Sequence, residues 1–169
     1  MSNYRISLLS EGFFDFVDID ESEFTIEDIA HNLSRICRFT GAIEKFYSVA
    51  QHSVLVSYAV EREHALAALL HDASEAFMND INSPLKALLP GYKRIEKKVE
   101  KEIFKRFGLK FPMHPSIKVA DTNIFQAEDY YLRGNVNKLG PYFKPVVAWT
   151  AAKSKKKFIE RFNELTEGK

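Results

Sequence analysis

The chain of 169 residues is 46% hydrophobic and 28% charged, which is typical of one globular domain with a substantial core. Its net charge of +1 provides no overall field that would draw the protein to nucleic acid or to an anionic membrane. The single cysteine, Cys37, excludes an intrachain disulfide and favours a reducing compartment.

The N-terminal segment lacks the basic and then apolar layout of a signal peptide, and no later run approaches the about 18 apolar residues that span a bilayer. We therefore expect one soluble, cytoplasmic domain over residues 1–169 with no membrane partner. Residues 4–9 and 13–19, which flank a turn at 10–12, predict a short β-hairpin at the start of this domain.

Helical spacing of apolar residues predicts the rest of the fold. Thr25 and Thr150 are the expected N-caps of the first and last helices, and Asp28 forms an imperfect capping box with Thr25. Gly108 is an expected C-cap, and the segment around Pro84 is a predicted loop. The fold class is therefore all-α, a helical bundle with a small N-terminal β-hairpin. The expected helices cover residues 26–39 (ending near Gly41), 49–64, 65–80, 92–108, 116–134 and 151–165, with a loop at 135–149.

Residues of the types that bind metal ions stand in apolar helical surroundings. His71 and Asp72 are adjacent, and Glu75 follows on the same face of the expected helix. His52 stands among apolar residues of the preceding helix, which has to pack close by because the connection is short. Asp121 also has apolar neighbours, and a buried aspartate needs a cation or hydrogen-bond donors as partners.

Each of these residues has an ordinary structural interpretation when it is taken alone. A hydrogen bond explains a single buried histidine or aspartate, and a solvated helix face explains Asp72 with Glu75. Together, however, two imidazoles and two carboxylates from three apolar helices match a site for Mn²⁺, Fe²⁺, Co²⁺, Ni²⁺ or Zn²⁺. The lack of a cysteine cluster argues against a structural zinc finger.

The order of these residues resembles the HD-domain phosphohydrolases, an all-α, metal-dependent superfamily with an upstream histidine, a His-Asp doublet and a later aspartate. The segments "QHS", "LLHDASEA", "DINSPLK" and "IKVAD" resemble its 5′-deoxynucleotidase branch and the compact phage dATP triphosphohydrolases linked to 2-aminoadenine genomes. The likeness extends from about residue 25 to residue 129. It implies an HD-domain bundle in which a Co²⁺, Mn²⁺ or Zn²⁺ ion is held by His52, His71, Asp72 and Asp121.

The resemblance also implies where a deoxynucleotide substrate binds. Arg38 would contact its phosphate, a role that suits a guanidinium fork. Phe39 would lie against the deoxyribose, where relatives often carry Trp, and Gly41 is a further substrate-binding candidate. On the sequence alone, the preferred interpretation is that Arg38 is a surface residue at the end of the first helix and Phe39 a core residue.

Further acidic and basic residues are implied to surround the metal. Glu75 and Asp80 look like the additional acidic pair of the family, which activates water or holds a second ion such as Mg²⁺ or Mn²⁺. A turn or N-cap role is the alternative for Asp80. Lys86 and Lys118 would contact the phosphates, although most lysines are simply solvated.

The implied reaction is hydrolysis at the 5′ phosphoester, in which a bound ion lowers the pKa of the attacking water. Asp72 or Glu75 would accept the proton, and Arg38, Lys86 and Lys118 would offset charge on the phosphoryl oxygens. Attack on dATP or another dNTP would release deoxynucleoside and triphosphate. The short chain and the two lysines favour this triphosphohydrolase.

Other activities stay open at this stage. A 5′-deoxynucleotidase acting on dNMPs is the first alternative, and a non-catalytic nucleotide-binding regulator with the HD fold is the second. Hydrolysis of cyclic dinucleotides or (p)ppGpp is disfavoured by the "ICRF" and "SPLK" segments. A homo-oligomer, either a dimer or a hexamer, is expected from the family, in the host cytoplasm if the protein is phage-encoded. A nucleic-acid partner is not expected.

Overall fold

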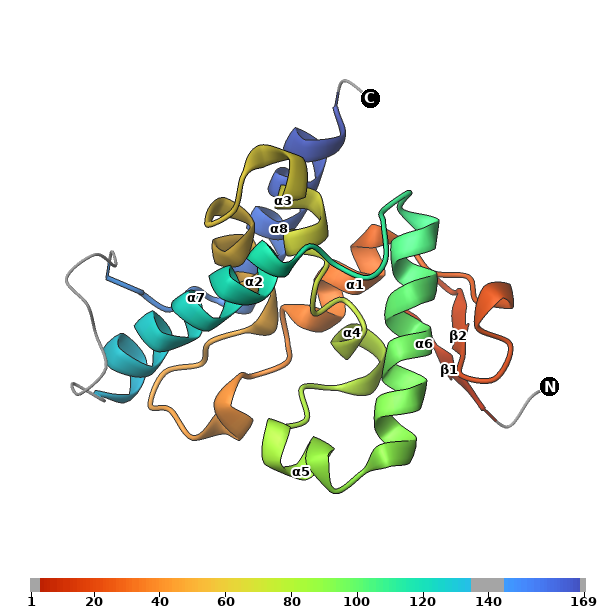
Figure 1. Ribbon diagram of the computed structural model, residues 1–169, viewed down its shortest axis with the longest axis horizontal. Coiled ribbons are helices and arrows are strands. Elements are labelled where there is room, and N and C mark those ends of the chain that lie inside the picture. Colours follow the sequence, from red (N-terminus) through yellow and green to blue (C-terminus); the bar gives the residue numbers. More distant parts are fainter. Residues whose placement is uncertain (1–3, 135–144, 168–169) are drawn as a thin grey trace.

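The computed structural model describes residues 4–134 and 145–167 (Figure 1). These residues are mostly helical with a two-stranded antiparallel sheet near the N-terminus, which confirms the predicted fold class. Every helix among them is too short or too polar to cross a bilayer. The elements are β1 (Arg5–Ser7), β2 (Phe13–Asp15), η1 (Ile19–Glu21), α1 (Ile26–Leu33), η2 (Phe39–Gly41), α2 (Val49–Tyr58), α3 (Arg62–Leu69), α4 (Glu75–Met78), α5 (Ser83–Ala87), α6 (Pro90–Arg106), α7 (Pro115–Arg133) and α8 (Ala151–Thr166).

The N-terminal hairpin is attached to the core through aromatic rings. Ile6 of β1 pairs with Phe14 of β2, as the predicted hairpin requires. Phe14 is completely buried and stacks on Phe77 of α4, with ring centroids 4.1 Å apart and an interplanar angle of 15°. Phe24 contacts both rings. The hairpin therefore supports α4, the short helix that directly follows His71 and Asp72.

The first helix begins where the sequence predicts but ends earlier. Thr25 and Asp28 form a complete capping box, whereas the expected end near Gly41 is wrong because α1 stops at Leu33. Backbone bonds from Arg38 N to the Tyr47 carbonyl, 2.9 Å, and from Val49 N to the Ile36 carbonyl, 3.1 Å, tie the following segment into a loop. These long-range bonds outcompete helix continuation, so Arg38 lies in a loop rather than at a helix end.

The two helices expected at 49–64 and 65–80 are divided differently. α2 ends at Tyr58, α3 covers Arg62–Leu69, and α4 begins only at Glu75. Between α3 and α4 the backbone forms tight turns, with bonds from Ala73 N to the Leu70 carbonyl and from Glu75 N to the Asp72 carbonyl. His71 and Asp72 therefore lie in a turn at the end of α3. The apolar pattern runs through this turn without a break, which is why the sequence predicted one helix.

The C-terminal half follows the prediction more closely. Gly108 and Gly134 adopt positive φ angles of 66° and 70° just after α6 and α7, and Thr150 caps α8. The expected loop at Pro84 instead contains the short helix α5, whose first turn is capped by the Asn82 side chain. Of the expected loop at 135–149, residues 135–144 lie outside the described residues, and 145–149 have no regular structure.

The core lies where these helices meet. α2 packs against α3, α7 and α8, while α1 packs against α4 and α8. Side chains from α1, α3, α6 and α8 fill the interior and are completely buried; they include Leu33, Leu69, Ile103, Phe104 and Phe158. This packing holds α2, the end of α3 and α7 next to one another, and these are the elements that carry the metal-ligand candidates (Figure 1).

Replacing Asp28 by asparagine is expected to lower the free energy of unfolding by about 2 kcal/mol, as measured by urea denaturation. The Asp28 carboxylate accepts hydrogen bonds from the backbone and side chain of both Ser10 and Thr25. An amide nitrogen in place of one oxygen cannot accept these bonds. The matched control is Asp20→Asn, which changes an exposed aspartate.

The decrease in the free energy of unfolding caused by Asp28→Asn should also depend on pH. Burial raises the pKa of Asp28, but the hydrogen bonds from Ser10 and Thr25 outweigh it and lower this pKa below the ordinary value. The stabilisation is complete above the unfolded-state pKa of about 3.9 and is lost as the pH falls through the folded-state pKa. The stability difference from wild type should therefore shrink in acid, and a constant difference would contradict this explanation.

Candidate metal centre

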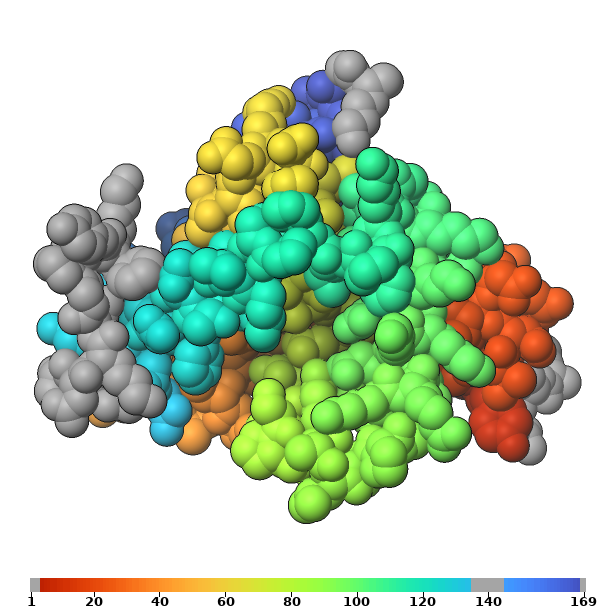
Figure 2. All heavy atoms as spheres, in the orientation of Figure 1, coloured from red at the N-terminus to blue at the C-terminus, as the bar shows by residue number. Residues whose placement is uncertain are grey.

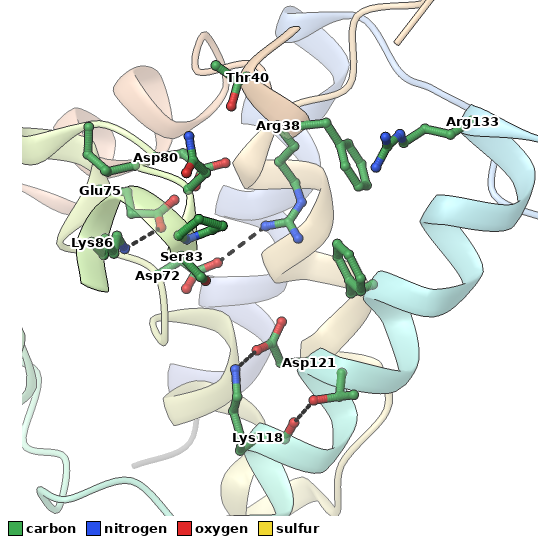
Figure 3. A pocket seen from close by; sticks show the side chains of 16 residues that line it. Arg38, Thr40, Asp72, Glu75, Asp80, Ser83, Lys86, Lys118, Asp121 and Arg133 are labelled. Carbon is green, nitrogen blue, oxygen red and sulfur yellow. Dashed lines mark hydrogen bonds and ion pairs between the residues drawn. The ribbon is translucent and has the colours of Figure 1, made fainter. Parts of the chain in front are cut away.

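A cavity of about 630 Å³ opens between α7 and the segment that runs from the end of α3 to α5. In Figure 2 the surface is hollowed between teal α7 and green α5 and α6, with the olive segment before α4 at its floor. Figure 3 shows side chains from three parts of the chain pointing into this space. The charged side chains among its lining are Arg38, Asp72, Glu75, Asp80, Lys86, Lys118, Asp121 and Arg133.

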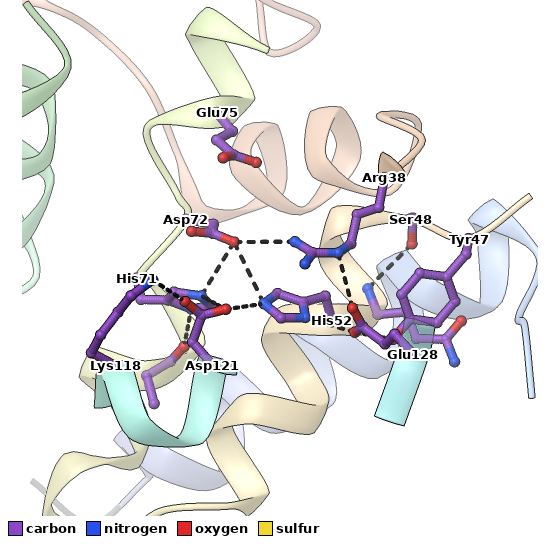
Figure 4. Close-up of polar contacts among 12 residues, drawn as sticks. Arg38, Tyr47, Ser48, His52, His71, Asp72, Glu75, Lys118, Asp121 and Glu128 are labelled. Carbon is purple, nitrogen blue, oxygen red and sulfur yellow. Dashed lines mark hydrogen bonds and ion pairs between the residues drawn. The ribbon is translucent and has the colours of Figure 1, made fainter. Parts of the chain in front are cut away.

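The four residues implied as metal ligands come together at one point (Figure 4), where Asp72 and Asp121 line the cavity and the buried His52 and His71 lie behind them. Nε2 of His52 on α2 lies 3.2 Å from Oδ1 of Asp121 on α7 and 3.7 Å from Oδ2 of Asp72. Nε2 of His71 lies 3.2 Å from the same Asp72 oxygen and 4.0 Å from Asp121 Oδ1. Potential ligand atoms of His52, His71 and Asp72 all lie within 4.8 Å of one another.

The backbone determines which nitrogen of His71 is free to bind a metal. Its Nδ1 lies 2.8 Å from the carbonyl oxygen of Ala68, an atom that only accepts, so Nδ1 carries the hydrogen. In the neutral ring Nε2 then bears a lone pair. This nitrogen is buried and has no hydrogen-bond partner among the described residues. It is directed at the Asp72 carboxylate, which also offers lone pairs.

His52 is oriented by a buried carboxylate. Its Nδ1 lies 2.6 Å from Oε1 of Glu128, so this nitrogen donates and Nε2 again faces the cluster in the neutral ring. Burial and the charge of Arg38 lower the pKa of His52, but Glu128 and Asp121 outweigh them and raise it. The charges of His52 and Arg38 overcome the effect of burial and lower the pKa of Glu128, so this carboxylate is ionised.

This arrangement fits a metal ion. Burial raises the pKa values of Asp72 and Asp121, but the neighbouring histidines outweigh it and lower both pKa values below the ordinary range of aspartate. When the two histidines are neutral, their Nε2 lone pairs and the two carboxylates face one another in a largely buried space, and a cation between them would replace the protons that otherwise offset the carboxylate charge. Two nitrogen and two oxygen donors also match the preferences of divalent transition metals.

Arg38 extends from its loop over the metal-ligand cluster. Its Nε lies 3.2 Å from Oε2 of Glu128 and its Nη1 3.6 Å from Oδ2 of Asp72. Burial lowers the pKa of Arg38, but these two carboxylates outweigh it and raise the pKa, so the guanidinium stays charged. A charged group with a fixed direction at the cavity wall is suited to binding an anion next to the cluster.

Phe39 lies at the outer side of the same wall. Its ring centroid is 5.7 Å from that of Phe125 on α7, and the Arg133 guanidinium lies 5.5 Å from the Phe39 ring. All three side chains line the cavity. Gly41 is exposed and is not among the lining residues, whereas its neighbour Thr40 is. The structure therefore places Phe39 at the cavity and Gly41 outside it.

The two further acidic residues line the cavity beside Asp72 (Figure 3). Glu75 is only 6% exposed, and its Oε2 has no hydrogen-bond partner among the described residues. Burial, followed by the charges of Asp72 and Asp80, raises the pKa of Glu75 well above its ordinary value. Burial also raises the pKa of Asp80. Both carboxyls are therefore poised to hold a proton or to bind a cation.

The two predicted lysines line the cavity, and both are paired with carboxylates. Lys86 Nζ lies 2.5 Å from Oε1 of Glu96 and 3.6 Å from Oε1 of Glu75. Lys118 Nζ lies 2.7 Å from Oδ2 of Asp121, while the Lys118 side chain is 81% exposed. An incoming anion would have to compete with these ion pairs.

Sequence reasoning missed several residues of this site. Glu128 has the largest role, since it contacts both His52 and Arg38 from a position seven residues after Asp121 on α7. That spacing is two helical turns, so the shared face was visible in the sequence. Phe125, four residues after Asp121, shares this face as well. Glu96 and Arg133 had no comparable signal, because their contacts join segments that are distant in the chain.

Comparisons with known proteins place the chain in a family. It is 39% identical to the uncharacterized protein YfdR of Escherichia coli (strain K12), over 96% of this chain and 96% of YfdR. It is 36% identical to an uncharacterized protein of Rhodobacter capsulatus, over 68% of this chain and 66% of that protein. No family model matches the chain. Since the likeness to YfdR extends over nearly the whole of both chains, this protein belongs to the same family as YfdR.

Proposed function

We propose that the protein is a metal-dependent phosphohydrolase of the HD-domain type that hydrolyses deoxynucleotides. One observation carries the proposal: two imidazole nitrogens and two carboxylates converge beside a cavity that the two carboxylates line, next to a largely buried arginine. The HD-type order of these four residues in the sequence supports the same conclusion. The favoured substrate is dATP or another dNTP, from which hydrolysis releases deoxynucleoside and triphosphate.

The ion that we propose for the cluster is Co²⁺, Mn²⁺ or Zn²⁺, with His52, His71, Asp72 and Asp121 as its ligands. When bound, it would supply a Lewis acid for the phosphoryl group and lower the pKa of a water. The alternative role of Glu75 and Asp80, in place of activating water, would be to hold a second ion, Mg²⁺ or Mn²⁺, since hard cations prefer carboxylate oxygens.

The roles of the surrounding side chains follow from their positions. Arg38 would bind the α-phosphate, because its guanidinium is charged and fixed beside Asp72. Glu75 would take the proton of the attacking water, since it lies at the cavity wall with a raised pKa and a free buried oxygen. Lys86 and Lys118 would bind the outer phosphates once phosphate oxygens replace the carboxylates with which these lysines are now paired.

The experiment that tests this function presents purified protein and Co²⁺ or Mn²⁺ with dATP and dAMP in separate reactions. Release of deoxyadenosine and intact tripolyphosphate from dATP is the expected result, detected by ion chromatography. Protein treated with a chelator is the matched control and should be inactive until metal is restored. Phosphate released from dAMP alone would rule out the triphosphohydrolase.

A 5′-deoxynucleotidase acting on dNMPs is the second candidate, and one observation favours it. Lys86 and Lys118 are both engaged by carboxylates, which leaves fewer unpaired cations for a triphosphate chain. A non-catalytic nucleotide-binding regulator is the third candidate, and nucleotide binding by metal-loaded protein without turnover would favour it. The homo-oligomer and the cytoplasmic location stay predictions of the sequence.

A further inference from the structure

Glu128 of α7 is completely buried and is the centre of a network of hydrogen bonds and ion pairs behind the cavity (Figure 4). Its Oε1 accepts a hydrogen bond from the Tyr47 hydroxyl at 2.7 Å and lies 2.6 Å from Nδ1 of His52. Its Oε2 lies 3.2 Å from Nε of Arg38. One carboxylate thus contacts both a metal-ligand candidate and the arginine of the cavity wall.

Glu128 cannot act on a substrate directly. It is not among the residues that line the cavity; its Oε1 is engaged by Tyr47 and His52, and its Oε2 forms an ion pair with Nε of Arg38 but no hydrogen bond among the described residues. A buried carboxylate is unfavourable unless neighbouring charges and hydrogen bonds compensate its lost hydration. For Glu128, the side chains of Tyr47, His52 and Arg38 provide this compensation. Its influence on chemistry therefore has to pass through His52 and Arg38.

We infer that Glu128 is the positioning residue that aims both the metal-binding nitrogen of His52 and the phosphate-facing guanidinium of Arg38. The contact to Nδ1 keeps the hydrogen on that nitrogen, leaves the Nε2 lone pair toward the cluster and increases the basicity of the ring. The contact to Nε holds the guanidinium so that Nη1 lies beside Asp72. The inference rests on the proposed function, and it couples metal affinity to anion affinity through one residue.

The test is the Glu128→Gln variant of the full chain, with Co²⁺ affinity measured by competition with a chromophoric chelator. The amide has one accepting oxygen, so it cannot serve His52 and Arg38 together. The expected loss of Co²⁺ affinity is about 10- to 100-fold, the range for outer-shell partners of metal ligands. The visible absorption spectrum of bound Co²⁺ should change as well, because the direction of the His52 nitrogen changes.

The effect of Glu128 on Arg38 is tested by measuring the binding of inorganic tripolyphosphate at saturating Co²⁺. Glu128→Gln should bind it about tenfold more weakly than wild type, as the guanidinium loses its fixed direction, which corresponds to about 1.4 kcal/mol. Tyr47→Phe is the structural control, since it removes one hydrogen bond to the same carboxylate and leaves the contacts to His52 and Arg38. It should lower the melting temperature and leave the Co²⁺ spectrum unchanged.

Glu128→Asp keeps the inference testable if Glu128→Gln does not fold. The shorter side chain retains the charge but cannot reach His52 and Arg38 at their present distances. A folded variant of either kind with the wild-type Co²⁺ affinity and spectrum would overturn the inference. Failure of the wild-type protein to bind Co²⁺, Mn²⁺ or Zn²⁺ would instead contradict the proposed function, so the two failures are distinguishable.

Discussion

The His71→Ala variant is expected to lose Co²⁺ affinity by more than roughly 100-fold, because removing a ligand should exceed the effect of removing an outer-shell partner. In the wild-type protein, Nε2 of His71 is buried and directed at Asp72, and the contact of Nδ1 to the Ala68 carbonyl holds the ring in place. No other described residue offers a nitrogen at that point of the cluster. Isothermal titration calorimetry on purified protein measures the loss, and nucleotide hydrolysis should disappear with it.

The control for His71→Ala is His64→Ala, which removes a histidine outside the metal-ligand cluster. The His64 ring stacks on His114, with centroids 4.0 Å apart, and is partly exposed at the start of α3. Both variants lose an imidazole, so a general effect of destabilisation would appear in both. Equal Co²⁺ affinity in His71→Ala and wild type would remove the central support for a metal centre.

The Glu75→Gln variant is expected to lower kcat by about 10²- to 10⁴-fold, the usual contribution of a general base, while Co²⁺ affinity stays near wild type. Glu75 lies at the cavity wall next to Asp72 but is not one of the proposed ligands, and burial raises its pKa. An amide fills the same space without accepting a proton. Steady-state hydrolysis of dATP and a parallel Co²⁺ titration separate the two effects.

Glu102→Gln is the matched control for Glu75→Gln. Glu102 pairs with Lys105 on α6 and does not line the cavity. The Glu102→Gln variant should hydrolyse dATP at the wild-type rate. If Glu75→Gln keeps full kcat, another group accepts the proton, and Asp72 or Asp80 becomes the candidate. If Glu75→Gln instead loses Co²⁺ affinity, Glu75 acts as a metal ligand.

Local rules predicted the ends of several elements correctly. Thr25 with Asp28, Thr150 and Gly108 lie at the helix boundaries that their capping chemistry indicated. The boundaries that failed are those set by contacts between distant segments. α1 stops at Leu33 because the backbone after it forms hydrogen bonds with the segment around the start of α2. The residues near Leu33 contain no signal that predicts these bonds.

The candidate site divides in the same way. The types and order of His52, His71, Asp72 and Asp121 were readable because ligand chemistry requires particular residue types in apolar surroundings. The turn that presents His71 and Asp72 was not readable, since an apolar pattern does not distinguish a helix from the tight turns that follow α3. The pairing of Lys86 with Glu96 was equally hidden, because it joins α5 to α6.

By itself, the sequence determined the helical fold class, the N-terminal hairpin and the set of residues able to bind a metal, since periodicity, capping and side-chain chemistry are local properties. Only the tertiary structure decided which nitrogen of each histidine faces the cluster and that Glu128 links His52 to Arg38. These features depend on distances between α2, α7 and the loops around them. Packing of the whole core sets such distances, and no local pattern encodes them.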